Sequence, residues 1–192
     1  MEIPNHLMER LASLSVDGAQ ALVGLAEFRQ LDKNEPYVRE GDTKKTIAIV
    51  SAGILRGYFQ HDAKEHTFGF VQPNKVAGNL DSILLGQASG RFFSPVGGPV
   101  SLWEFDYEAV DTLLLENPAW EHIRSMLLAE ILGDVLTWTR GYVVHSPEER
   151  YAILEEQYPE LLQQVPLKYL ASWIGVTDVT LSRIRRRRLE DS

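Results

Sequence analysis

The residues best suited to chemistry lie between 167 and 186, where arginines are combined with the apolar pattern of two short crossed helices. Gly175 stands where a first helix can end in the left-handed conformation, and Thr177 or Asp178 can cap a second helix. Apolar packing positions lie on both sides of this turn: Leu170, Ala171, Ile174, Val176, Leu181 and Ile184. The stretch is therefore predicted to be a helix-turn-helix.

The predicted second helix is amphipathic, and its polar face is the candidate for contact with DNA. Leu181 and Ile184 face inward and leave polar side chains outward: Asp178, Thr180, Ser182, Arg183, Arg185 and Arg186. An outward arginine on a helix in the major groove can donate two hydrogen bonds to guanine. The alternative is an ordinary helical hairpin with a solvated basic end.

Charge distribution favours DNA over the ordinary hairpin. The whole chain has a formal charge of −8, but residues 167–192 contain Lys168 and five arginines against Asp178, Glu190 and Asp191. Positive charge concentrated at one end of an acidic protein suits local phosphate contact, and it argues against nonspecific coating of DNA.

Composition sets the broad class of protein. The 192 residues include 44% hydrophobic residues, enough for a folded core, and no cysteine, which excludes disulfides, thiolate zinc sites and cysteine nucleophiles. The first residues lack the apolar core of a signal peptide, and no run reaches membrane-spanning length. We expect a soluble cytoplasmic protein that does not bind membranes.

The chain upstream predicts an α+β protein in three parts. Residues 5–27 have helical spacing, interrupted near Ser15 and Gly18. Residues 28–105 alternate short apolar runs with turn signals, among them 51–53 and 96–99, as in an antiparallel barrel, jelly roll or sandwich. A short helix is predicted at 107–116, and Pro118 can start a longer one. We predict a β-roll sensor domain at 1–116, a long central helix at 117–144 and a helix-turn-helix domain at 145–192. Ser146, Pro147 and Glu149 form the capping-box start of the last domain.

The long central helix has an apolar band that is too wide for one buried face. Its apolar residues are Trp120, Ile123, Leu127, Leu128, Ile131, Leu132, Val135, Leu136 and Trp138. One side can cover its own domain while another meets a second copy, so the helix is a predicted homodimer seam. Complete burial within one subunit is the alternative.

A β-roll, a long helix and a helix-turn-helix in this order resemble the Crp/Fnr family of bacterial transcription regulators. The resemblance rests on Arg39-Glu40-Gly41-Asp42, the turn Ser51-Ala52-Gly53, the stretch 146–176 and TLSRIRR at 180–186. It implies transcription regulation as a homodimer on double-stranded DNA, with two half-sites about 34 Å apart and RNA polymerase as a further partner. Arg183 matches the family's base-reading arginine, and Thr180 matches a phosphate-contacting position.

Other DNA-contact candidates follow from position and charge. Arg185, Arg186 and Lys168 are predicted to contact phosphates with Thr180, and Thr177 and Ser182 complete the predicted interface. Asp178 and Val179 occupy positions where other members present base-contacting arginine or glutamate, so the operator is expected to differ from theirs.

The effector cassette departs from the family pattern. Cyclic-nucleotide binders resembling this chain have Gly-Glu-Leu, whose Glu holds the ribose, and later an arginine for the phosphate followed by a small hydroxyl residue. Here the sequence is Gly78-Asn79-Leu80, and Arg91 precedes Phe92. These five residues are the effector-pocket candidates for an unknown small molecule. A standard cyclic nucleotide is not favoured, and no cofactor is predicted.

Two other classes of function are compatible with parts of the sequence. A small-molecule-binding β-roll with a protein-contacting or vestigial helix-turn-helix is favoured by the acidic body and by the short sequence after the second helix, because of which we do not expect a full wing. A cupin-like metalloenzyme would need more than His61 and His66 around Glu65. No Ser-His-Asp arrangement can be argued from spacing, so neither a catalytic site nor a metal site is predicted, and the protein is expected not to be an enzyme.

Overall fold

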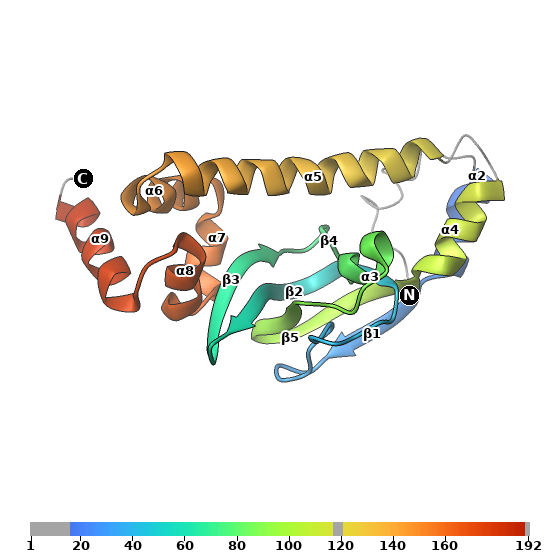
Figure 1. The fold of residues 1–192 in the computed structure, drawn as a ribbon, viewed down its shortest axis with the longest axis horizontal. Helices are drawn as coiled ribbons and strands as arrows, with labels where there is room; N and C mark the ends of the chain where they lie inside the picture. The colour runs from blue at the N-terminus through green and yellow to red at the C-terminus, as the bar shows by residue number, and fades with distance from the viewer. Residues whose placement is uncertain (1–15, 117–120, 191–192) are drawn as a thin grey trace. The chain divides into compact units, whose positions relative to one another are not determined.

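The computed structural model describes residues 16–116 and 121–190 and divides into two compact units. The first unit contains the chain up to Gly57 together with Phe70–Leu128, and the second contains Tyr58–Gly69 and the chain from Ala129 onward. The elements of the first part of the chain are α2 (Val16–Gly24), β1 (Glu27–Leu31), β2 (Thr46–His61), β3 (Lys64–Val71), β4 (Val76–Gly78), α3 (Leu80–Leu85), β5 (Phe92–Asp106) and α4 (Tyr107–Glu116). These are followed by α5 (Glu121–Val144), α6 (Pro147–Gln157), α7 (Pro159–Gln164), α8 (Leu167–Ile174) and α9 (Asp178–Glu190) (Figure 1).

The strands form one five-stranded sheet in the order β1-β5-β2-β3, with β4 paired to β2. β1 and β5 are antiparallel with Leu31 opposite Val100, and β2 and β4 are antiparallel with Ile47 opposite Gly78. The buried apolar residues of these strands include Leu31, Ala48, Val50, Leu55, Val100 and Leu102. The predicted antiparallel β-roll with flanking helices is confirmed.

Two predicted turns are in fact bends inside long strands. The sequence indicated separate strands before and after the stretches 51–53 and 96–99, but β2 and β5 run through them. Gly53 and Gly97 have positive φ values of 82° and 80°, so each strand bends without ending. A Cβ on Gly53 would lie 2.6 Å from the Pro99 carbonyl oxygen, so glycine is required where these two strands cross closely.

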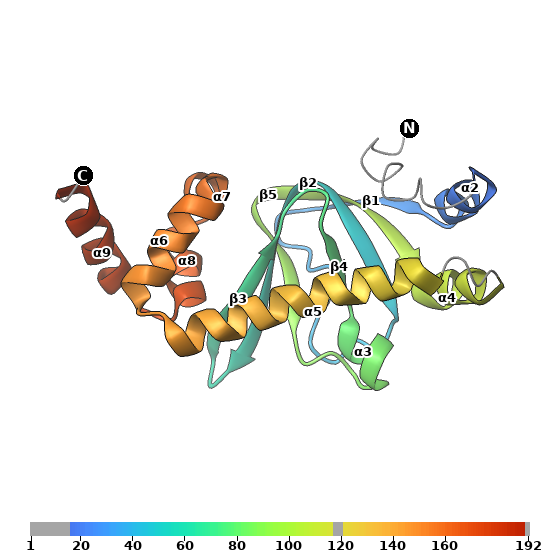
Figure 2. The same ribbon diagram turned by 90° about the horizontal axis from the view of Figure 1, so that it is seen from above.

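Two helices close one end of the sheet in the first unit. α2 and α4 lie side by side in both views (Figures 1 and 2), and Leu22 of α2 joins Val110 and Leu114 of α4 in a cluster with Trp103 and Phe105 of β5. The predicted helix at 107–116 is confirmed. α2 continues through Gly18, where an interruption was predicted, while the residues before Val16 lie outside the described part of the chain.

The long central helix is continuous from Glu121 to Val144, as Figure 2 shows. Its predicted start at Pro118 and the predicted seam residue Trp120 lie outside the described residues. Large apolar side chains remain exposed along it: Leu128, Leu132, Val135, Leu136 and Val143. Among the described helices, none combines the length and the apolar character that spanning a membrane requires.

The second unit has its own helical core. Ser146 caps α6 through a complete capping box with Glu149, as predicted, and Pro147 occupies the first turn. The buried core residues of α6 to α9 are Tyr151, Leu154, Leu161, Val165, Leu170, Ala171, Trp173, Ile174, Leu181 and Ile184. Five of the six packing positions predicted for the helix-turn-helix are therefore buried, while Val176 is partly exposed.

Candidate functional site

The turn between α8 and α9 is built as the sequence indicates. Gly175 adopts the left-handed conformation (φ 76°), and the Val176 amide donates a 2.9 Å hydrogen bond to the Ala171 carbonyl, which closes the end of α8. Thr177 then caps α9, because its hydroxyl oxygen accepts the Thr180 amide hydrogen at 3.2 Å. These local bonds fix the direction in which α9 leaves the turn.

The outward face of α9 carries the predicted DNA-contacting side chains. Leu181 and Ile184 are buried against α8. The side chains predicted to contact DNA are all exposed: Lys168, Thr177, Thr180, Ser182, Arg183, Arg185 and Arg186. Lys168 lies on α8, where its ammonium group sits 4.7 Å from the centre of the Tyr169 ring. The fold thus brings α9 residues Ser182, Arg183 and Arg186 to one face, with Lys168 on the adjoining helix.

The arginines nearer the end of α9 have contacts with α6. Arg188 donates from Nε to a Glu155 carboxylate oxygen at 2.5 Å, and Arg185 lies close enough to the Tyr151 hydroxyl to influence its pKa. Burial is the main cause of the raised pKa of Tyr151, and Arg185 opposes that rise. Arg185 therefore interacts with α6 and is also exposed to solvent. Arg183 and Arg186 form no ion pair within the described residues.

Arg150 anchors the turn, a role that sequence reasoning missed. Its guanidinium donates to the Ile174 carbonyl at 3.0 Å and to the His145 carbonyl at 2.5 Å, and it lies 4.8 Å from the centre of the Tyr142 ring. The Tyr142 hydroxyl donates to the Trp173 carbonyl. Sequence spacing gives no signal for the bonds to Ile174 and Trp173, because they join side chains to backbone carbonyls of another helix.

An aromatic cluster fills the space around Trp173. The Trp173 ring is 4.3 Å from that of Trp138 and 5.9 Å from that of Tyr158, measured between centroids. On its other side the Trp173 indole N–H donates to the Phe68 carbonyl of β3 at 3.2 Å. The end of α5, helix α8 and the β2–β3 hairpin therefore meet within the second unit.

The predicted effector residues lie around α3 and the start of β5. Gly78 ends β4 and is opposite Ile47, Leu80 begins α3, and Phe92 begins β5 with partial exposure. Asn79 is buried and caps α3: its amide nitrogen donates to the Asp42 and Lys44 carbonyls at 3.0 and 3.1 Å. The Asn79 side chain is thus used to hold the preceding loop.

Arg91 already has an anionic partner. Its Nε donates to one oxygen of Asp81 at 3.0 Å, its Nη2 donates to the other at 2.5 Å, and the Gly90 amide also donates to Asp81. Burial opposes ionisation of Asp81, but the bonds from Arg91 and Gly90 outweigh it and lower the pKa of the carboxyl group. This two-pronged ion pair occupies one edge of the Arg91 guanidinium, and such an edge is also the geometry by which an arginine can bind a phosphate.

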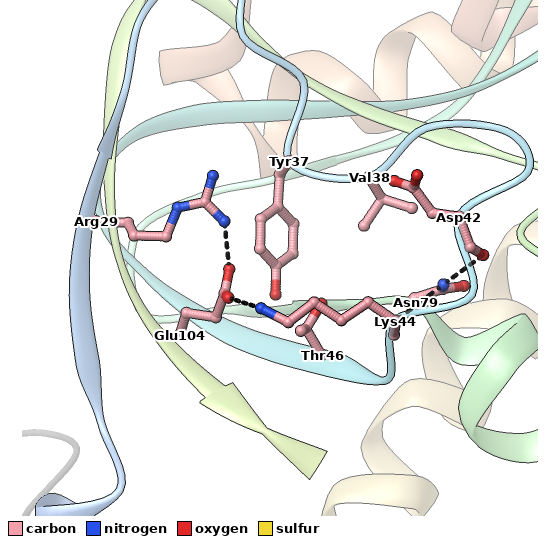
Figure 3. Close-up of a pocket in the computed structure, with 8 residues that line it drawn as sticks. All are labelled: Arg29, Tyr37, Val38, Asp42, Lys44, Thr46, Asn79 and Glu104. Atoms are coloured by element: carbon pink, nitrogen blue, oxygen red, sulfur yellow. Dashed lines mark hydrogen bonds and ion pairs between the residues drawn. The ribbon is translucent and has the colours of Figure 1, made fainter.

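A separate polar pocket of about 160 Å³ lies inside the first unit (Figure 3). Glu104 accepts bonds from Arg29 at 2.6 Å and from Lys44 at 2.7 Å, and of the predicted effector residues Asn79 lines this pocket. The buried Tyr37 hydroxyl points toward Thr46 without a hydrogen bond of good geometry among the described residues.

The chemistry of this pocket is polar but not strongly cationic. Burial raises the pKa of the Tyr37 phenol, so its hydroxyl stays protonated and available as a donor. Glu104 pairs with both Arg29 and Lys44, and Glu35 also pairs with Arg29. Two carboxylates therefore balance the two cations, and the pocket presents hydroxyl groups rather than free positive charge. Within the described residues, no group of three potential metal ligands occurs.

Comparison with known proteins identifies the fold. No protein-family profile and no curated protein matches the sequence. Among solved structures, the chain has the fold of the Crp/Fnr regulators, a cyclic-nucleotide-binding-like β-roll with a helical C-terminal domain. The resemblance predicted from the sequence is confirmed at the level of the fold.

Three of these structures illustrate the likeness. CLP, a c-di-GMP-responsive global regulator of Xanthomonas campestris, is 16% identical with a TM-score of 0.71, covering 92% of this chain and 93% of CLP. A CooA variant from Carboxydothermus hydrogenoformans is 17% identical with a TM-score of 0.70 and coverages of 96% and 84%. A Crp/Fnr regulator from Eubacterium rectale is 14% identical with a TM-score of 0.73 and coverages of 96% and 88%.

Proposed function

We propose that this protein is a homodimeric transcription regulator that binds double-stranded DNA in a sequence-specific manner. The observation that carries the proposal is the exposed arginine face of α9, held by a capped turn opposite the buried Leu181 and Ile184. Arg183 is the base reader, because its exposed guanidinium can donate two bonds to guanine in the major groove. Arg186, Thr180 and Lys168 contact phosphates, and Arg185 and the hydroxyl groups of Thr177 and Ser182 add to the interface.

A second copy of the chain is the proposed partner of α5. Leu128, Leu132, Val135 and Val143 are exposed and recur at spacings that place them along one side of the helix. Such a stripe is costly in water and suits a parallel pairing of two α5 helices. Pairing would present two α9 helices to two half-sites about one DNA turn, ~34 Å, apart.

The proposed effector is not a standard cyclic nucleotide. A cyclic phosphate would have to displace Asp81 from Arg91, and Asn79 is engaged with the backbone of the preceding loop. Losing the Arg91 bonds would leave the Asp81 carboxylate with its charge partner removed, which is unfavourable in a partly buried position. The roll is therefore proposed to respond to another small molecule or to act without one.

The proposal is tested by selecting bound duplexes from random DNA near physiological salt, with ligand-free protein and with added cyclic AMP. We expect enrichment of a two-fold symmetric site, the same in both arms, and an affinity that falls steeply with salt as phosphate contacts release counterions. Enrichment confined to the cyclic AMP arm would contradict the effector proposal, and failure to bind any duplex would contradict DNA binding.

On the selected site, Arg183→Ala is expected to cost about 1 to 3 kcal/mol and to relax base preference at one position in each half-site. The matched variant Arg187→Ala removes the same charge from α9 without changing the predicted base reader. It should weaken binding to all sequences by a similar, smaller factor. Equal losses on all sequences for both variants would contradict the role of Arg183. Binding curves on the selected site and on single-base variants measure the difference.

A further inference from the structure

We infer that the polar pocket beside Tyr37 binds a small neutral polyol, with Tyr37 and Glu104 as its hydrogen-bonding residues. The inference deepens the proposed function, because it gives the β-roll a class of effector, and it rests on that function for the regulatory role of the ligand. The pocket is not the predicted effector site: of the predicted effector residues, Asn79 alone is among those that line it. Ligand binding can be tested without DNA.

The pocket is enclosed by segments that are far apart in the sequence (Figure 3). Arg29 lies on β1, Glu104 lies on β5, and Tyr37 lies on the stretch between β1 and β2. The pocket has a volume of about 160 Å³. A protein cavity of ~150 Å³ accepts benzene, so this space has room for a ligand of about six non-hydrogen atoms. Glycerol is a polyol of this size.

The Tyr37 hydroxyl is the observation that points to a ligand. The residue is 7% exposed, and its hydroxyl oxygen has no hydrogen-bond partner of good geometry among the described residues. In Figure 3 this hydroxyl points into the space beside Glu104 and Thr46. A buried polar group without a partner destabilises a fold, and such groups are rare in native proteins. A bound molecule that presents an acceptor oxygen here would supply the partner.

Glu104 gives the pocket its second hydrogen-bonding group. Its side chain is 5% exposed, and its two carboxylate oxygens accept bonds from Arg29 and Lys44 at 2.6 and 2.7 Å. Each carboxylate oxygen has a further lone pair, so Glu104 can accept from a ligand without losing its ion pairs. A hydroxyl group can accept from Tyr37 and donate to Glu104, which is why a hydroxylated molecule fits these two residues.

The charges around the pocket favour a neutral ligand over a charged one. An anion would be repelled by Asp42 and Glu104, and a cation would be repelled by Arg29 and Lys44, which already pair with Glu104. A charged ligand would also lose its hydration without gaining an unpaired partner of opposite charge. Val38 adds apolar surface that suits the carbon chain of a polyol.

The binding test uses the isotope-labelled full chain with glycerol as the probe. Glycerol also stabilises proteins because it is excluded from their surface, so the measurement is the saturable change in amide chemical shifts and not the melting temperature. We expect shifts at the pocket residues that saturate with a Kd of about 0.1 to 10 mM, the range for a ligand of this size. Glycerate and serinol, matched probes that carry a carboxylate and an ammonium group, should bind at least about tenfold more weakly.

Tyr37→Phe removes the proposed hydrogen-bond donor and keeps the ring. It should weaken glycerol binding at least about tenfold. In buffer without glycerol its melting temperature should equal or exceed that of the parent, because the removed hydroxyl has no partner. Tyr158→Phe is the matched control, since it removes the same atom from the second unit and should bind glycerol as the parent does.

The inference is overturned if the pocket shifts never saturate, if a charged probe binds more tightly than glycerol, or if Tyr37→Phe keeps the affinity of the parent. A lower melting temperature of Tyr37→Phe would overturn it too, because the hydroxyl would then be bonded within the protein. None of these results bears on DNA binding, which is measured on the selected duplex. Failure to bind any duplex would refute the proposed function and the regulatory role of the ligand, while the glycerol titration would still decide whether the pocket binds a polyol.

Discussion

Asp81 is the residue that most changes the chemistry of the loop around Arg91. The carboxylate and the guanidinium are joined through two bonds, and Gly90 adds a third to the same carboxylate. A loop that supplies its own anion has no need of an anionic ligand to hold Arg91 in place. The pair therefore links the engagement of Arg91 within its own loop to the proposed insensitivity to cyclic nucleotides.

Asp81→Asn is expected to lower the free energy of unfolding by about 1 to 3 kcal/mol at neutral pH, because it removes a charge-assisted pair from a largely buried site. Since the Asp81 pKa is lower in the folded protein than in the unfolded chain, its contribution is complete above the unfolded pKa of about 3.9. That contribution is lost as the pH falls through the folded pKa. Urea unfolding from pH 7 to pH 3 should therefore show a smaller difference between variant and parent at the acid end. A constant difference across this range would refute the assignment.

Individual residues also show which structural features can be predicted from the sequence and which cannot. Gly175, Thr177, Ser146 and Glu149 were predictable, because turns and caps depend on local backbone geometry. The bond between Asp81 and Arg91 joins residues ten positions apart across a loop, so no periodic pattern in the sequence predicts it.

At the level of elements, the β2–β3 hairpin is bonded to the first helix of the helix-turn-helix. The Ser172 hydroxyl oxygen accepts the Thr67 amide hydrogen at 2.9 Å and donates to the Glu65 carbonyl at 3.1 Å. With the bond from Trp173 to Phe68, these contacts tie α8 to β3 through backbone groups. The hairpin residues are thereby assigned to the same compact unit as α8.

Ser172→Ala should destabilise this attachment without disturbing the core, because the removed hydroxyl makes two bonds to the hairpin backbone. We expect a loss of about 1 to 2 kcal/mol in unfolding free energy and faster hydrogen exchange at the Thr67 amide. Ser125→Ala on α5 is a matched control at an exposed helical position and should leave that exchange rate unchanged. Unchanged Thr67 exchange in Ser172→Ala would show that the hairpin does not depend on this hydroxyl.

Elements were predicted best where the pattern was local and strong. The helix at 107–116, the capped start of α6 and the two helices around Gly175 follow from periodicity and caps. The strand ends were wrong at residues 51–53 and 96–99, because glycine signals a turn and a strand bend equally well. Only the close approach of Gly53 to Pro99 in the structure shows that Gly53 lies in a strand bend and not in a turn.

At the scale of the whole molecule, positive charge and exposed apolar surface lie on different helices, α9 and α5. The chain has a net charge of −8, while α9 is strongly basic, so an acidic body would keep DNA contact confined to that helix. The exposed leucines and valines of α5 cannot serve the same partner, because they carry no charge for phosphates. These separate surfaces support an assembly in which protein pairing and DNA contact are independent and can be tested separately.

Leu132→Glu tests the proposed pairing of α5 helices. Leu132 is 57% exposed in the middle of the apolar stripe, so a carboxylate there leaves a single chain folded but places two like charges at a seam. Light scattering at micromolar concentration should give a dimer for the parent and a monomer for the variant. Affinity for the complete two-fold site should fall more than tenfold, because linked half-sites are lost, while binding to a single half-site is retained. Thr137→Glu, exposed on the opposite side of the same helix, should remain dimeric. A dimeric Leu132→Glu would exclude this stripe as the seam.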